Sequence, residues 1–286
     1  MDRLETRLRS VDPLVREVIA RVPPQRPPPS PPEWLRYEML ERHAVLERAE
    51  VSAGTTVVEV GSGAHAMATV PLALAVGREG RVVAVERARW DHFRSVVAAC
   101  GVDSQIRPVA ADARWLPLRS DSAELAVCVH GVRSLHGTAS AVPVVREMFR
   151  VAPRVMIAES LPIARNEAQR AHLAMYALRE PVLRAATGRP DDLPYPSLEE
   201  LGGLVESAGG AVERRETLDV DLPHYLAWFP RSLVESIADP AAREPLLRRW
   251  DDADGRIRQH GEDHPPVGLV LARRTERPAG TGRGGI

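Results

Sequence analysis

A glycine turn, Gly61-Ser62-Gly63, is the part of this chain whose residue types and spacing are best suited to bind a ligand. It follows a short apolar run at residues 57–60, which is typical of a buried strand in a parallel sheet, and it precedes an alanine-rich helical pattern. Glycines have no Cβ and let the backbone approach a ligand closely, while the start of the following helix offers unpaired N–H groups. A strand, a glycine turn and a helix in this order predict the first half of a nucleotide-binding unit.

A carboxylate, Glu86, stands at the end of the next predicted strand, residues 81–86, after a helix that ends near Gly77. An acidic side chain at this position can accept hydrogen bonds from both hydroxyl groups of a ribose. The alternative interpretation is that Glu86 is a solvated strand end. The order of glycine turn, helix and acid favours the ligand-binding role.

Four segments of the chain together resemble the class I S-adenosylmethionine-dependent methyltransferases, a broad family of small Rossmann-like enzymes. These segments are residues 57–63, 83–86, 111–113 with 116–117, and 124–130. The resemblance covers residues 34–160, roughly, with a continuation over residues 197–273. It implies an α/β fold with a Rossmann-like, seven-stranded, mostly parallel sheet, helices on both faces and helical lid insertions. It also implies S-adenosyl-L-methionine as the cofactor.

The resemblance further implies which residues hold the cofactor. In the family, the acidic residue that corresponds to Asp112 accepts a hydrogen bond from the adenine amino group, and the backbone beside it reads a ring nitrogen. The residues that we expect to contact the cofactor lie at or just after the ends of the first four predicted strands: Glu59, Gly61, Ser62, Gly63, Glu86, Arg87, Asp112, Ala113 and Val129. One departure is His65, which stands where the family often has a third glycine. The sequence leaves open whether this histidine impairs cofactor binding.

The loop after the predicted fourth strand, residues 125–129, carries His130, Arg133 and His136. Ligands of open α/β sheets bind at the carboxyl ends of the strands, so this loop faces the transferred methyl group if the resemblance holds. A neutral imidazole at His130, with an ordinary pKa of about 6.5, could take a proton from an acceptor hydroxyl or amine. We therefore predict that His130 is the catalytic residue. The competing account is that His130 packs beside the cofactor and hydrogen-bonds to the backbone.

Four residues are expected to bind the substrate: Tyr37, Arg133, His136 and Glu159. Tyr37 belongs to a predicted helix before the first strand, which in the family often borders cofactor and substrate, although ordinary packing explains it equally well. Glu159 ends the predicted fifth strand, residues 154–159, and so lies at the same edge of the sheet. The two cysteines, Cys100 and Cys128, have no metal-binding spacing, and no metal site is predicted.

Composition limits the classes of partner. The net charge of −1 argues against a general nucleic-acid or membrane surface. All 38 basic residues are arginine, which excludes a Schiff-base or lysine general-base mechanism. The chain shows no signal peptide and no apolar run of about 18 residues, so we expect a soluble cytoplasmic protein. A small-molecule acceptor is favoured, whereas a nucleic-acid or protein acceptor and a homo-oligomer remain open.

The predicted organisation has three parts. Residues 1–32 form an N-terminal arm with a proline-rich linker, and residues 277–286 form a flexible tail. Residues 33–276 form the class I methyltransferase domain, with insertions at about 160–196 and 224–265. In the resembling family, insertions after the fifth strand commonly form lids over small substrates.

Two other functions fit parts of the sequence. Residues 61–66 match the pattern G-x-G-x-x-A, and Glu86 matches the ribose acid of an NAD(P)-dependent oxidoreductase. Against that function stand the helix before the first strand, Asp112, and a C-terminal half that continues the same sheet. A catalytically inactive relative that serves as a regulatory or scaffold subunit is the third hypothesis, and His65 is its support. Calorimetric titration separates the three by binding of S-adenosylhomocysteine, of NADH, or of neither.

Overall fold

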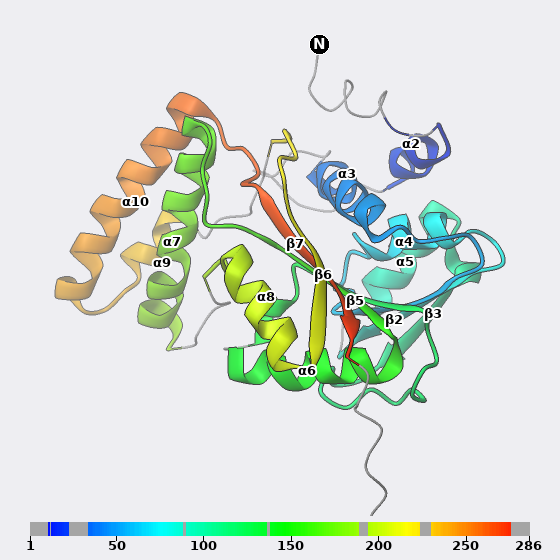
Figure 1. The fold of residues 1–286 in the computed structure, drawn as a ribbon. Coiled ribbons are helices and arrows are strands. Elements are labelled where there is room, and N and C mark those ends of the chain that lie inside the picture. The colour runs from blue at the N-terminus through cyan, green and yellow to red at the C-terminus, as the bar shows by residue number, and fades with distance from the viewer. Residues whose placement is uncertain are drawn as a thin grey trace, which may run out of the picture.

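A seven-stranded sheet with the order β3-β2-β1-β4-β5-β7-β6 organises the described part of the chain (Figure 1). The computed structural model describes residues 11, 13–22, 34–87, 90–135, 138–188, 194–223 and 230–275. The strands are β1 Thr56–Val60, β2 Arg81–Glu86, β3 Ile106–Ala110, β4 Leu125–Val129, β5 Arg154–Ser160, β6 Gly210–Leu218 and β7 Val267–Arg274. Strands β1 to β5 pair in parallel, and β7 runs antiparallel to both β5 and β6. The predicted mostly parallel sheet is therefore confirmed.

The strand order creates a switch point between β1 and β4. From β1 the chain builds outward through β2 and β3 on one side, and then returns to place β4 against the other side of β1. The loops after β1 and β4 consequently leave the sheet in opposite directions and open a crevice at the carboxyl ends of the strands. Ligands of open α/β sheets bind in such crevices.

Helices cover both faces of this sheet. The helices are α2 Pro13–Ala20, α3 Trp34–Leu46, α4 Thr69–Val76, α5 Trp90–Cys100, α6 Thr138–Val151, α7 Glu167–Thr187, α8 Leu198–Ser207, α9 Arg231–Glu235 and α10 Pro240–His260, with short 3-10 turns at Glu47–Ala49, Asp103–Gln105 and Val132–Leu135. Helices α2 to α5 pack on one face with Val57, and α6 and α8 pack on the other with Val58. Successive side chains of a strand point to opposite faces, so each buried apolar strand supplies both cores.

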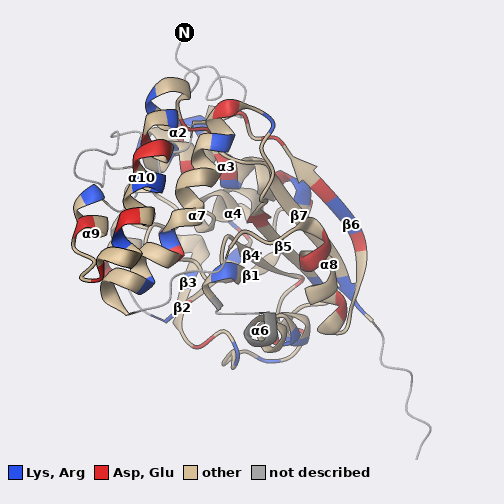
Figure 2. Cartoon of the chain, turned by 90° about the vertical axis from the view of Figure 1, so that its left-hand side faces the viewer, with Lys and Arg blue, Asp and Glu red and all other residues tan. Residues whose placement is uncertain are grey.

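The predicted insertions contain a helical unit of their own. Helices α7, α9 and α10 share a separate apolar cluster that includes Met175, Leu178 and Leu246, and Figure 1 shows them together beside the sheet. Asn166 begins α7 by accepting a hydrogen bond from the backbone of Gln169. Figure 2 shows acidic and basic residues along both α9 and α10. Residues 189–193 and 224–229 of the insertions lie outside the described residues.

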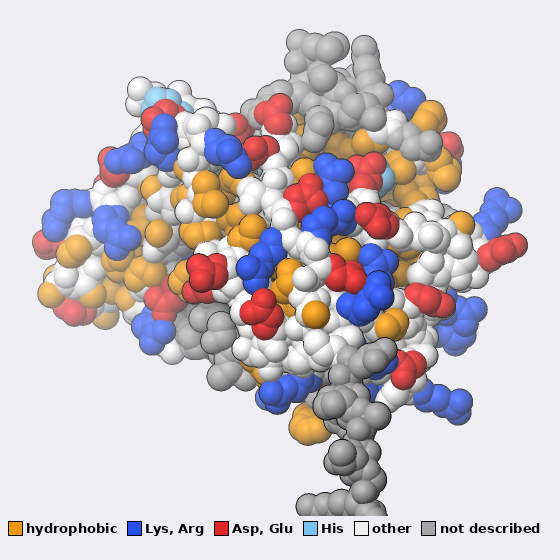
Figure 3. Space-filling view, in the orientation of Figure 1, with side chains coloured by type: hydrophobic (Ala, Val, Ile, Leu, Met, Phe, Trp, Pro, Cys, Tyr) orange, Lys and Arg blue, Asp and Glu red, His pale blue; other side chains and the backbone are white. Residues whose placement is uncertain are grey.

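Of the N-terminal arm, the structure describes residue 11 and residues 13–22, which include α2. Val15, Val18 and Ile19 are buried in the core on the α3 side of the sheet, so α2 packs on the domain. The whole predicted proline-rich linker, residues 23–32, and the whole predicted tail lie outside the described residues. Among the helices that are described, none is both long and apolar enough to cross a membrane. On the face drawn in Figure 3, basic and acidic side chains are interspersed.

Candidate active site

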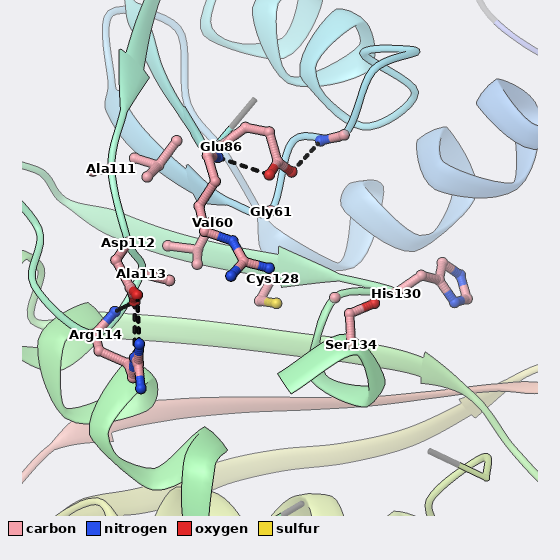
Figure 4. Close-up of a pocket in the computed structure, with 14 residues that line it drawn as sticks. Val60, Gly61, Glu86, Ala111, Asp112, Ala113, Arg114, Cys128, His130 and Ser134 are labelled. Carbon is pink, nitrogen blue, oxygen red and sulfur yellow. Dashed lines mark hydrogen bonds and ion pairs between the residues drawn. The ribbon is translucent and has the colours of Figure 1, made fainter. Parts of the chain in front are cut away.

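A cavity of about 410 Å³ lies at the carboxyl ends of the central strands (Figure 4). It is lined by Val60, Gly61, Gly63, Val85, Glu86, Arg87, Ala111, Asp112, Ala113, Arg114, Cys128, His130, Gly131 and Ser134. Six of the nine residues expected to bind the cofactor are among them, together with the predicted catalytic residue, His130. The cavity thus coincides with the crevice that the strand order creates.

The glycine turn needs glycine for conformational reasons. Gly61 and Gly63 have φ angles of +80° and +64°, in the left-handed region that side chains with a Cβ rarely adopt. Gly61 also lies close to Gly131, since a Cβ on Gly61 would stand 3.9 Å from the Gly131 Cα. The turn therefore presents bare backbone to the cavity.

Two backbone N–H groups hold the Glu86 carboxylate in position. Its Oε2 accepts a hydrogen bond of 3.2 Å from the N–H of Gly63, and its Oε1 accepts one of 2.7 Å from the N–H of Arg87. Both interactions are drawn in Figure 4. The carboxylate is thereby oriented at the end of β2, where it can accept further hydrogen bonds from a pair of hydroxyl groups.

Asp112 lies at the other end of the cavity and is hydrogen-bonded to Arg114, a residue that was not predicted from the sequence. Arg114 donates to Asp112 from Nε at 3.0 Å, from Nη2 at 2.7 Å and from its backbone N–H at 2.9 Å. These hydrogen bonds lower the pKa of Asp112 to about 2. Arg114 follows Asp112 by two residues in a turn, and this short spacing is the feature of the sequence from which their contact could have been predicted.

Three of the expected cofactor residues do not line the cavity: Glu59, Ser62 and Val129. Glu59 is buried, and its Oε2 accepts a hydrogen bond of 2.5 Å from the Thr69 hydroxyl. Burial raises the pKa of Glu59 to about 7, the Thr69 hydrogen bond opposes this rise, and the charge of Glu86 adds to it. Glu59 thus ties β1 to the start of α4, and its contact with a cofactor stays a prediction.

The pKa of His130 differs from the expectation. Its Nε2 lies 3.0 Å from Oε1 of Glu41, its Nδ1 lies 3.6 Å from Oε2 of Glu159, and its backbone has a left-handed φ of +53°. Burial lowers the pKa of an imidazole, but the charge of Glu41 and hydrogen bonds to both carboxylates raise the pKa of His130 above 6.5. The expected ordinary pKa of His130 is therefore contradicted, because two buried carboxylates favour the protonated form. Its catalytic role stays a prediction.

Glu41 and Glu159 are the buried acids on either side of His130. Burial raises the pKa of Glu41, but Arg42 and His130 outweigh it and lower that pKa to about 2. Glu159 accepts hydrogen bonds from the N–H groups of Val132, at 2.7 Å, and Arg133, at 3.3 Å. Glu41 was missed in the sequence because charged residues are rarely buried unless they are paired, whereas α3 buries Glu38, Glu41 and Arg42.

The three predicted substrate residues that the structure describes, Tyr37, Arg133 and Glu159, do not line the cavity. Tyr37 is buried in the core beneath α3, and Glu159 is fully buried beside the loop after β4. The Arg133 guanidinium carbon lies 5.8 Å from the ring centre of Tyr176 and 5.3 Å from that of Tyr195, which belong to the first insertion. His136 lies outside the described residues. Substrate contact by these four residues stays a prediction.

Comparisons with other proteins agree on the fold. No protein-family model matches the chain, and no curated protein matches it. Its structure is similar to that of a cyclopropane-fatty-acyl-phospholipid synthase-like protein from Lactobacillus casei, with a TM-score of 0.70 and 12% identity over 91% of this chain and 98% of that chain. It is also similar to a SAM-dependent methyltransferase from Aquifex aeolicus, with a TM-score of 0.51 and 16% identity over 84% of this chain and 93% of the other. The 4+2 cyclase SpnF is a third similar structure, with a TM-score of 0.53 and 15% identity over 94% of this chain and 93% of the cyclase.

These similarities identify the fold, which is that of the class I S-adenosylmethionine-dependent methyltransferases. The resemblance found in the sequence is confirmed at this level. At such low identity the fold carries no activity by itself, and the three similar structures are named for different reactions. The reaction has to be argued from the site.

Proposed function

We propose that this protein is an S-adenosylmethionine-dependent methyltransferase and that its cofactor binds in the cavity beside the glycine turn. The observation that carries the proposal is the arrangement of Gly61, Gly63, Glu86 and Asp112 around one cavity at the switch point of the sheet. A volume of about 410 Å³ is within the usual range for small-molecule sites, which is roughly 300–1,000 Å³.

The residues present fit this cofactor. Glu86 is oriented to accept the two ribose hydroxyl groups, and Asp112 is a carboxylate acceptor suited to an exocyclic amino group. The left-handed glycines let the chain approach the ligand without a Cβ between them. His65, the residue in place of a third glycine, packs between Trp34 and His92 and does not line the cavity. This position weakens the argument for an inactive protein.

The bound cofactor would supply an electrophilic methyl group. The chain's own residues would position it: Asp112 and Glu86 hold one end, and Figure 4 shows His130 and Ser134 on the opposite side of the cavity from Asp112. We therefore propose that the acceptor enters near His130, next to Tyr176 and Tyr195. In this proposal the acceptor is a small molecule, which α7, α9 and α10 shield from water.

The oxidoreductase alternative is less well supported. In this sheet the antiparallel strand β7 lies between β5 and the edge strand β6. The common dinucleotide-binding sheet has the strand order 3-2-1-4-5-6 instead. Titration with NADH remains the direct test of that alternative.

Replacing Glu86 with alanine is expected to weaken the binding of S-adenosylhomocysteine by about 1–3 kcal/mol, because the ribose hydroxyls lose their charged acceptor. Isothermal titration calorimetry measures this change, and the exposed Glu79→Ala variant is the matched control. Unchanged affinity in a folded Glu86→Ala protein would reject the ribose assignment. Binding of NADH in place of S-adenosylhomocysteine would reject the proposed function.

Substitutions of Asp112 and Arg114 provide a second test, because they should change the affinity for S-adenosylhomocysteine in opposite directions. Asp112→Ala removes the proposed acceptor for the adenine amino group and should weaken S-adenosylhomocysteine binding about fivefold. Arg114→Ala removes the guanidinium that occupies both oxygens of Asp112 and should strengthen binding. The same calorimetric titration applies to both variants. If the two substitutions change the affinity in the same direction, Asp112 and Arg114 do not compete with adenine in this way.

A further inference from the structure

Three buried side chains meet beside the cavity although they are far apart in the sequence. Glu41 comes from α3, His130 from the end of β4, and His264 from the segment that leads into β7. Each offers one ligand-type atom, and these atoms lie within 4.8 Å of one another. The side chains of Glu41 and His130 are only 1% and 5% exposed, and His264 is also buried.

The outer nitrogen of each histidine faces an oxygen. His264 donates from Nδ1 to the carbonyl oxygen of Pro265 at 2.7 Å, so Nε2 carries the lone pair when this ring is neutral. His130 directs Nε2 toward Glu41 and has Oε2 of Glu159 3.6 Å from its Nδ1. Metal-binding histidines almost always have their outer ring nitrogen held by a carbonyl or carboxylate in this manner.

The surrounding backbone and charges hold this arrangement in place. The N–H of His264 donates to Leu222 at 2.9 Å, and its carbonyl accepts from the Gln169 side chain at 2.9 Å. Arg42 contacts Oε2 of Glu41 and thereby leaves Oε1 directed at His130. Glu41 can therefore offer one oxygen to a ligand shared with the two imidazoles.

We propose that Glu41, His130 and His264 bind a divalent transition-metal ion. Two imidazoles and one carboxylate suit zinc or ferrous iron, whereas magnesium and calcium prefer oxygen ligands. Three protein ligands leave at least one coordination position for a water or a substrate. His130 lines the cavity, so this position can face the acceptor.

The ion's role deepens the proposed function and rests on it. A bound ion would hold an acceptor hydroxyl near the methyl end of the cavity and lower its pKa, so that its proton is released to water and the oxygen then takes the methyl group. His130 would then act as a metal ligand, not as the proton acceptor that the sequence suggested. The binding of the ion itself does not depend on methyl transfer.

The competing account is an ion pair without a metal. Glu38, Glu41 and Glu159 face two guanidiniums, those of Arg42 and Arg133, with Arg42 2.6 Å from Glu38 and Arg133 4.0 Å from Glu159. In this account a proton on His130 bridges Glu41 and Glu159, and no metal ion binds. A direct binding measurement distinguishes the two.

The test uses the full chain without an affinity tag, stripped with a chelator and titrated with Co²⁺ and with Zn²⁺. We expect one ion per chain, visible absorption bands for Co²⁺, and an affinity at least about 100-fold weaker in His264→Ala. His260→Ala, which removes an exposed imidazole, should bind as the wild type does. Glu41→Gln keeps the side-chain shape and serves as the second variant if His264→Ala does not fold.

Absence of stoichiometric binding by the folded wild type overturns the proposal, as does equal affinity in the wild type and Glu41→Gln. Titration of the same stripped protein with S-adenosylhomocysteine separates this result from the proposed function. Cofactor binding without metal binding rejects the metal site alone. Metal binding without cofactor binding supports the metal site and contradicts the proposed function.

Discussion

Replacing Glu159 with alanine is expected to lower the free energy of unfolding by about 3–5 kcal/mol. Glu159 is fully buried, and Oε1 accepts hydrogen bonds from the N–H groups of Val132 and Arg133. Its Oε2 faces His130 at 3.6 Å and Arg133 at 4.0 Å. Alanine would leave two buried N–H groups without their acceptor and would remove one negative charge from beside His130 and Arg133, and water cannot readily replace the lost acceptor.

Urea unfolding at pH 7, in a buffer that contains a chelator, measures this change without a contribution from bound metal. Glu159→Gln keeps an oxygen acceptor but loses the charge, so its stability should lie between those of the wild type and Glu159→Ala. Glu213→Ala is the surface control: it breaks a partly exposed 2.7 Å ion pair with Arg273 and should cost at most about 1 kcal/mol. A loss below about 1 kcal/mol in Glu159→Ala would mean that this carboxylate does not hold the loop after β4.

Replacing Glu59 with glutamine is expected to make the protein more stable than the wild type at alkaline pH. The difference in free energy of unfolding between variant and wild type should favour the variant by about 3 kcal/mol more at alkaline pH than at pH 4.5. Burial raises the pKa of Glu59 from 4.5 to about 7 in the folded chain. Between these values the folded protein keeps a proton that the unfolded chain has lost. Stability therefore falls as the pH rises from about 4.5 to 7, and the loss is complete above the folded pKa. Glutamine does not ionise, so the variant escapes this loss.

Free energies of unfolding for the wild type and Glu59→Gln, measured in urea from pH 4.5 to pH 8, provide the test. Thr69→Val is a useful companion variant, because Thr69 donates to the ionised carboxylate and lowers its pKa. Without that hydrogen bond, the pH dependence should extend to higher pH. Parallel stability curves for the wild type and Glu59→Gln would show that Glu59 is ionised in the folded protein throughout this range.

Local sequence was sufficient for most of the sheet. The predicted strands at 81–86 and 125–129 correspond to β2 and β4, because buried parallel strands are short, nearly continuous apolar runs. The edge strand β6, Gly210–Leu218, is harder to predict from local sequence. It carries alternating charged residues and is half-buried, so its ends have a weaker apolar signal.

The sequence by itself determined the glycine turn, Glu86 and Asp112, since each follows directly from a strand end and the topology brings strand ends together. Only the tertiary structure decided the surroundings of His130. Glu41 lies 89 residues away on a helix that buries some of its charged residues, and His264 arrives from the segment before β7. The charge and coordination of an imidazole depend on such neighbours through space, and no local pattern reports them.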